Sequence, residues 1–154
     1  MRDGIRLATA LCLGDDITAR PAVLVRLPYD KSGRYTFMPQ LAAHFTSRGY
    51  VFVVQDIRGK FRSGGDTMPY AHEVTDGYET IDWISQQRWC DGTVGMFGDS
   101  YYGYTQWAAV ASGHPRASRH RAQGYQRRHR REPDPVGGSG RVVVRGRLSR
   151  ALLG

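Results

Sequence analysis

Short apolar runs and stretches of helical spacing alternate along the first 115 residues of the chain. The apolar runs predict strands at 21–26, 50–55 and 94–97. Apolar residues three and four positions apart predict helices at 38–48, 71–87 and 104–112. The second run is continuous and rich in β-branched residues, which is typical of a strand buried on both faces of a sheet. The pattern predicts an α/β fold with a mostly parallel sheet and flanking helices.

The composition of the chain changes near Pro115. The whole chain carries a net charge of +8, yet residues 1–115 hold 11 basic and 12 acidic residues. Residues 116–154 hold 11 arginines, two acidic residues, no lysine and a single aromatic residue. We therefore divide the chain into a folded part, 1–115, and an arginine-rich tail, 116–154, which we expect to be disordered.

The sequence favours a cytoplasmic protein that does not associate with a membrane. No apolar run is long enough to cross a bilayer, and the first residues lead directly into mixed sequence without a secretory leader. Cys12 and Cys90 are far apart and lack metal-ligand spacing. We therefore expect two reduced thiols, with neither a disulfide framework nor a zinc site.

A serine between two glycines follows the last predicted strand, in the stretch Gly98-Asp99-Ser100-Tyr101-Tyr102-Gly103. A nucleophilic serine needs a sharp turn between strand and helix, because the turn exposes its hydroxyl and leaves neighbouring amides free to donate to an oxyanion. The usual elbow is G-x-S-x-G, whereas the spacing here is G-x-S-x-x-G, with Gly103 as the small residue on the helix side. The alternative is a glycine-rich turn in which the serine only caps the helix.

Five blocks of sequence extend this observation over residues 1–115. They are MRDGIRLA at 1–8, VRLPYDK at 25–31, VQDIRG at 54–59, DGYETIDW at 76–83 and WCDGTVGMFGDSY at 89–101. Together, and in this order, they resemble the CocE/NonD hydrolases, which include cocaine-esterase-like enzymes and the X-prolyl dipeptidyl aminopeptidases. The resemblance implies that 1–115 is the N-terminal part of an α/β-hydrolase domain. It also implies a serine hydrolase that cleaves ester or amide bonds of small ester or peptide substrates, without cofactor or metal.

The resemblance implies three catalytic assignments. Ser100 matches the nucleophile, on which the substrate would form an acyl-enzyme. Tyr29 matches the tyrosine whose hydroxyl donates to the oxyanion, and the backbone N–H of Tyr101 matches the second donor. Two such donors suit a tetrahedral intermediate, one directly after the nucleophile and one from an earlier strand-end loop. The alternative for Tyr29 is a loop tyrosine with its hydroxyl in water.

Other polar residues near the strand ends receive structural roles. Asp56 and Arg58 follow the strand at 50–55, where we expect an internal ion pair that fixes the following loop. His44 and His72 fall in helix-like or loop surroundings before the serine, and we expect them to be structural or solvated.

The triad acid and histidine are not assigned to any residue of this chain. In α/β-hydrolases the triad follows the order serine, acid, histidine, and the family's acid and histidine lie well beyond the nucleophile. The candidates after Ser100 are His114, His120, His129, Glu132 and Asp134. Only His114 lies in a family-like context, directly after the predicted helix. Because a serine without a base attacks poorly, we expect the chain as written to have little or no esterase activity.

Two hypotheses account for the tail. The first is a frameshift near codon 116: a reading one base further along permits ALRAIAPKVTSADIVG over residues 116–131, which resembles the family's continuation. The second is a genuine disordered arm that binds nucleic acid or an acidic partner through its arginines. We favour the frameshift, because no aromatic interleaving or nucleic-acid-binding motif accompanies the charge. A sheet that stops after the strand at 94–97 would leave an apolar edge uncovered.

Overall fold

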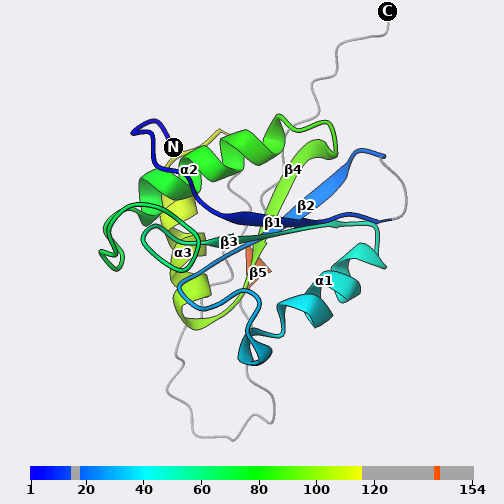
Figure 1. The fold of residues 1–154 in the computed structure, drawn as a ribbon. Helices are drawn as coiled ribbons and strands as arrows, with labels where there is room; N and C mark the ends of the chain where they lie inside the picture. The colour runs from blue at the N-terminus through cyan, green and yellow to red at the C-terminus, as the bar shows by residue number, and fades with distance from the viewer. Residues whose placement is uncertain (15–17, 116–140, 143–154) are drawn as a thin grey trace, which may run out of the picture.

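Five strands form one mixed sheet in the computed structural model, which describes residues 1–14, 18–115 and 141–142 (Figure 1). In spatial order they are β1 (Thr9–Cys12), β3 (Val51–Asp56), β2 (Arg20–Leu27), β4 (Cys90–Phe97) and β5 (Arg141–Val142). β2 runs parallel to both β3 and β4, whereas β1 and β5 pair antiparallel at the two edges. The three predicted strands are confirmed as β2, β3 and β4.

Helices cover both faces of this sheet (Figure 1). They are α1 (Met38–Thr46), α2 (Glu73–Ser85) and α3 (Ser100–Ala111), preceded by a short 3-10 turn, η1 (Arg34–Thr36). α2 and α3 lie on one face and α1 on the other, which agrees with the two separate groups of core residues. α1 ends at Thr46, two residues before the predicted end, and Gly49 follows with a φ of 80° that favours glycine.

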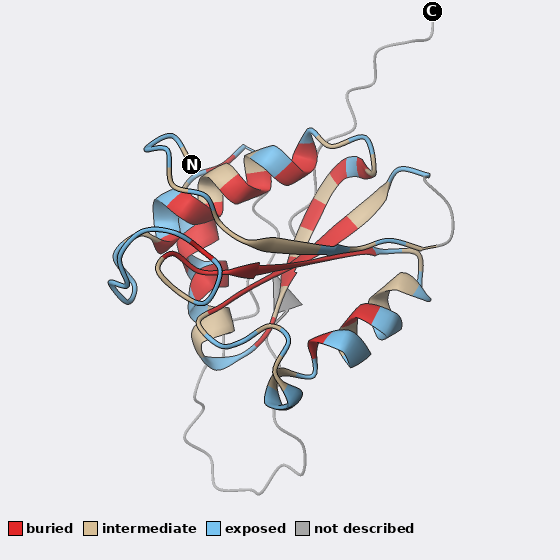
Figure 2. Cartoon of the chain, in the orientation of Figure 1, coloured by how far each residue is buried: buried red, intermediate tan, exposed pale blue. Residues whose placement is uncertain are grey.

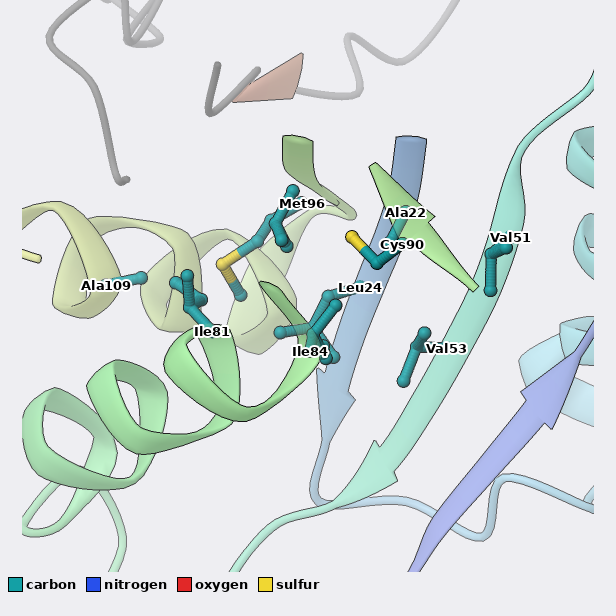
Figure 3. Close-up of a cluster of buried hydrophobic side chains, with 10 residues drawn as sticks. Ala22, Leu24, Val51, Val53, Ile81, Ile84, Cys90, Met96 and Ala109 are labelled. Carbon is teal, nitrogen blue, oxygen red and sulfur yellow. The ribbon is translucent and has the colours of Figure 1, made fainter. Parts of the chain in front are cut away.

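The alternation of side chains along β2 divides the core into two layers. Ala22 and Leu24 pack with Ile81 and Ile84 of α2 (Figure 3). Their neighbours in the strand point the other way and pack under α1. β2 and β3 are buried on both faces, as the central strands in Figure 2 show, and each fully buried Leu or Ile contributes roughly 1.5–3 kcal/mol.

Two predicted elements begin earlier than the sequence indicated, and the two edge strands, β1 and β5, were not predicted. β4 begins at Cys90, and α3 begins at Ser100, each four residues before its predicted start. The strand β1 was not predicted, because its four residues are mostly half-buried and lack a clear alternation. Its position is set by antiparallel pairing with β3, from Thr9 opposite Gln55 to Cys12 opposite Phe52.

The tail contributes one short strand to the described part of the chain. Arg141 pairs with Phe97, and Val142 pairs with Met96. The remainder of the tail lies outside the described residues, and with it the predictions of disorder, of a frameshifted segment and of a basic binding arm. Within the described ranges, no helix has the length and apolar character needed to cross a membrane.

Candidate active site

Three strands end at the same edge of the sheet, because β2 runs parallel to both β3 and β4. Tyr29 lies two residues after the end of β2, Asp56 is the last residue of β3, and Ser100 lies three residues after the end of β4. In open α/β sheets, ligands bind outside the carboxyl ends of the strands. The topology therefore brings the predicted nucleophile and the predicted oxyanion tyrosine to the edge where a substrate would bind.

The turn that carries Ser100 has a strained backbone. Ser100 has a φ of 50°, a left-handed conformation that is uncommon for a residue with a side chain. It is exposed and opens α3, whereas the N-cap of the helix is the extended residue Asp99. Asp99, rather than Ser100, therefore occupies the N-cap position of α3. Strain of this kind costs about 1–3 kcal/mol and persists only where the surroundings enforce it.

The two glycines that flank the serine do not have equal roles. Gly98 has a φ of 135°, and a Cβ on it would lie 2.3 Å from the Cβ of Tyr102. The backbone can make this turn only because residue 98 has no side chain. At Gly103 an added Cβ would meet only the carbonyl oxygen of Gly98, at 3.9 Å. The small residue is therefore required on the strand side of Ser100 and not on the helix side.

A buried glutamine fastens the start of the turn to the helix. The side-chain amide of Gln106 donates to the carbonyl oxygen of Gly98 at 2.7 Å and to that of Tyr102 at 3.2 Å. Gln106 is only 2% exposed, and its hydrogen bond to Gly98 is buried away from water. The sequence analysis did not identify Gln106, because the spacing of the motif does not indicate that the side chain of residue 106 contacts the backbone of residue 98.

Tyr29 contacts the first turn of α3 through its ring. Its ring meets the ring of Tyr102 edge-on, with 5.8 Å between the centroids. Tyr29 is 49% exposed, so its loop borders the open side of the site. Burial raises the pKa of Tyr102, and the neighbouring Tyr29 and Asp99 raise it further, so the Tyr102 phenol stays neutral at physiological pH.

Two hydrogen bonds hold the side chain of Tyr101. Its backbone N–H lies in the first turn of α3. Helix geometry provides no acceptor within the helix for the first amides. The phenol of Tyr101 donates to Oε1 of Glu73 at 3.0 Å and accepts from the backbone N–H of Tyr70 at 3.3 Å. The two tyrosine rings stack with 5.0 Å between their centroids. Burial is the main cause that raises the pKa of Tyr101 to about 12.

Asp56 and Arg58 belong to two separate groups of ion pairs and do not pair with each other. Asp56 is fully buried and pairs with Lys31 from the loop after β2. Arg58 donates to Asp76 at 2.6 and 3.0 Å, and to Asp3 at 2.6 Å. The expectation that these residues fix the segment after β3 agrees with these contacts, which tie it to α2 and to the N-terminus.

His114 lies at the far end of α3. It is buried against the ring of Tyr78, with 4.5 Å between centroids, and its Nε2 lies 3.5 Å from Oδ1 of Asp82. Because α3 has 12 residues, about 18 Å of helix separates this histidine from Ser100. His114 therefore cannot act as the base for Ser100 in this arrangement. His120 and His129, with Glu132 and Asp134, lie outside the described residues.

A cleft elsewhere on the molecule is separate from this site. It has a volume of about 270 Å³ and lies between α1 and the strands β2 and β4. Its lining includes Phe45 and Phe97, but none of Ser100, Tyr29 and Tyr101. Among the residues that the structure describes, no cluster of His, Cys, Asp or Glu is arranged to hold a metal ion.

The chain is similar in sequence to several known proteins. Residues 3–120 match the family described as X-Pro dipeptidyl-peptidase (S15 family). The cocaine esterase of Rhodococcus sp. (strain MB1 Bresler) is 46% identical over 115 residues, which cover 73% of this chain and 20% of that protein. A putative serine esterase of Mycobacterium bovis is 32% identical over 136 residues, which cover 75% of this chain and 22% of that protein.

Solved structures show the same relationship. An α-amino acid ester hydrolase superposes with a TM-score of 0.63 at 33% identity, over 75% of this chain and 22% of that one. A CocE/NonD family hydrolase from Staphylococcus aureus gives a TM-score of 0.66 at 27% identity, over 75% of this chain and 24% of that one. The chain spans about a fifth of the length of these curated relatives. Because the match extends over most of its length, the chain belongs to the X-Pro dipeptidyl-peptidase (S15) family of α/β-hydrolases, with CocE/NonD hydrolases among its structural relatives.

Proposed function

We propose that residues 1–115 carry the nucleophile and the oxyanion donors of a serine hydrolase, with Ser100 as the nucleophile. The observation that supports this most directly is the left-handed backbone of Ser100, at an exposed turn between β4 and α3. A strained conformation at a strand-to-helix turn is characteristic of a nucleophile elbow, because the turn projects the serine away from the sheet.

The oxyanion would be stabilised by two donors, one from α3 and one from the loop after β2. The backbone N–H of Tyr101 lies at the positive end of the α3 dipole, which favours negative charge nearby. The hydroxyl of Tyr29 is the second donor, supported by the contact of its ring with Tyr102 next to the elbow. Together they would stabilise the charge that develops on the carbonyl oxygen in the transition state.

The reaction would proceed through an acyl-enzyme. The hydroxyl oxygen of Ser100 attacks the carbonyl carbon, and the carbonyl electron pair moves to the oxygen to give the tetrahedral oxyanion. Collapse of this intermediate expels the alcohol or amine, which takes up a proton, and water then releases the acid from Ser100 by the same steps. A base is needed to accept the serine proton, and we propose that it and the triad acid come from sequence downstream of residues 1–115.

The substrate would be a small ester or an amide of a short peptide. Cocaine esterase and the α-amino acid ester hydrolase are relatives whose names refer to ester cleavage, and the family is named for an X-Pro dipeptidyl-peptidase. We choose an aryl ester for the test, because its good leaving group places the least demand on the missing acid–base groups.

The first measurement is the nucleotide sequence across codons 110–160 of the source gene, read on into any downstream frame. A one-base discrepancy that restores a longer frame would support the proposed frameshift. An unchanged frame, found also in related strains and encoding the same arginine tail, would contradict it.

The second measurement is turnover of a small aryl ester. The 154-residue chain should show little or no turnover, whereas a protein from a restored frame should be active. In that active protein, Ser100→Ala should reduce kcat by at least about a thousandfold. Ser112→Ala is the matched control at the other end of α3, where the hydroxyl donates to the Ala109 carbonyl and accepts from the backbone N–H of His114, and it should retain activity. Equal activity of the two variants would contradict the assignment of Ser100.

A further inference from the structure

A buried carboxylate connects the sheet to the residue that follows Ser100. Glu73 lies in the first turn of α2, and its Oε2 accepts a hydrogen bond from Nη1 of Arg26 at 2.7 Å. Its other oxygen, Oε1, accepts from the phenol of Tyr101 at 3.0 Å. One carboxylate therefore joins β2, α2 and α3, and each of its oxygens has a partner from a different element.

The surroundings hold this carboxylate in one place. The side chain of Arg26 is fully buried and that of Glu73 is 5% exposed. Arg26 is fixed in turn, because its Nε donates to Gln55 of β3 at 2.8 Å and its Nη1 also reaches the backbone carbonyl of Glu73 at 3.3 Å. A charged hydrogen bond in such a dry setting is stronger and more rigid than one in water.

The elbow needs such a fixed partner. The left-handed φ of Ser100 would relax unless the residues on both sides were restrained. On the strand side, the restraint is the hydrogen bond from Gln106 to the carbonyl of Gly98. On the helix side, the matching restraint is the phenol of Tyr101, held by Glu73 and stacked on Tyr70.

We propose that Glu73 is a positioning residue: held by Arg26, its carboxylate fixes the Tyr101 side chain and thereby aims the backbone N–H after Ser100 at the oxyanion. This inference rests on the proposed function, since the aim of that N–H matters only if Ser100 is the nucleophile. Glu73 takes no proton in this role. The pKa of Tyr101 is raised to about 12, so the phenol remains the donor at neutral pH.

The test compares two tyrosines of the same helix in the full 154-residue chain. Tyr101→Phe removes the hydroxyl that donates a hydrogen bond to Glu73. It leaves the Arg26–Glu73 ion pair intact, so the variant should fold. Tyr104→Phe is the matched control, because its hydroxyl donates to the exposed backbone carbonyl of Tyr70 at 3.3 Å. The readout is hydrogen exchange at the amide of Gly103, which donates to the carbonyl of Asp99 at 3.0 Å and closes the first turn after the elbow.

In Tyr101→Phe we expect Gly103 to exchange at least about tenfold faster, because a hydrogen bond to a charged group is lost. The amide of Val53, in the middle of the sheet, should keep its rate, and Tyr104→Phe should leave both amides unchanged. Equal acceleration at Gly103 and Val53 would mean a merely structural role and would overturn the proposal. An unchanged Gly103 would overturn it as well.

A second variant tests the carboxylate itself. Glu73→Gln keeps the size of the side chain and removes its charge. The pKa of Tyr101, followed in chains labelled with ¹³C at the tyrosine ζ carbon and assigned with Tyr101→Phe, should fall below its value of about 12. The control is Glu79→Gln, on the same helix, where the carboxylate accepts from the backbone N–H of Arg2. A Tyr101 pKa that is unchanged in Glu73→Gln would contradict the inference, while the ester assay of Ser100 judges the proposed function separately.

Discussion

Gly98 and Gly103 lie on either side of Ser100, and their surroundings predict opposite effects of the same substitution. Gly98→Ala should lower the free energy of unfolding by about 2–4 kcal/mol, because the new Cβ would collide with Tyr102 and the left-handed backbone would become strained. Gly103→Ala should be neutral or stabilise by up to about 1 kcal/mol, because it places alanine within a helix where the added carbon has room. Urea unfolding followed by circular dichroism measures both. Equal effects of the two substitutions would show that the elbow does not depend on Gly98.

A second residue, Asp3, should make the free energy of unfolding fall at acid pH. The guanidinium of Arg58 donates to its carboxylate and is the main cause that lowers the pKa of Asp3 below the ordinary value of 3.8. Because the folded pKa lies below the unfolded one, the contribution is complete above about pH 4 and is lost as the pH falls through the folded value.

Unfolding midpoints should therefore fall less steeply with decreasing pH in Asp3→Asn than in the unchanged chain. The exposed Asp66 offers the comparison, and Asp66→Asn should keep the original slope. The same acid profile in Asp3→Asn and the unchanged chain would contradict this prediction.

At the scale of elements, α2 is fastened to the sheet by buried charge as well as by its apolar face. Arg26 of β2 pairs with Glu73 at 2.7 Å, and its second terminal nitrogen lies 3.8 Å from Asp76. Both carboxylates belong to the first turn of α2, where the helix dipole also favours negative charge. Arg26 of the strand therefore holds Glu73 beneath Tyr101, while Asp76 is also held by Arg58.

Arg26→Leu should therefore destabilise the chain by about 3–5 kcal/mol, because it leaves the buried carboxylate of Glu73 without its charged partner. The control is Arg2→Leu. The side chain of Arg2 is 78% exposed, and its Nε lies 3.7 Å from Oε1 of Glu79. That surface pair should contribute about 0–1 kcal/mol. Chemical denaturation measures both changes, and a loss below about 1 kcal/mol for Arg26→Leu would show that the buried network is dispensable.

At the scale of the whole molecule, the sheet is covered unevenly. β2 and β3 are buried on both faces, whereas the residues of β4 that face α1 are only half-buried, and the cleft beside Phe97 opens there. Large side chains such as Phe61 and Trp107 are more than half exposed. Exposed apolar side chains of this size form an interface where they lie together on one surface.

We therefore expect the 154-residue chain to bind a hydrophobic dye and to associate as its concentration rises. Sedimentation velocity over a concentration series measures the association. Trp107→Gln, on the outer side of α3, should weaken it. A chain that remains monomeric over the whole series would show that the exposed apolar residues do not form a continuous surface.

The candidate site separates what local pattern can predict from what it cannot. The strand, the glycine and the serine at 94–100 are consecutive, so the turn could be located from the sequence. The roles of Ser100, Tyr29 and Tyr101 stay predictions from family resemblance. The contacts that hold the turn, Gln106 to Gly98 and Glu73 to Tyr101, could not be predicted, because they join residues that approach only after the helices have packed.

The sequence by itself determined the three central strands, the three helices and the family, because hydrophobic periodicity and contiguous blocks are properties of neighbouring residues. Tertiary structure decided the placement of β1, the start of α3 at Ser100 and the left-handed backbone there. Edge pairing and backbone strain depend on partners far away in the chain, and strain is tolerated only where those partners enforce it.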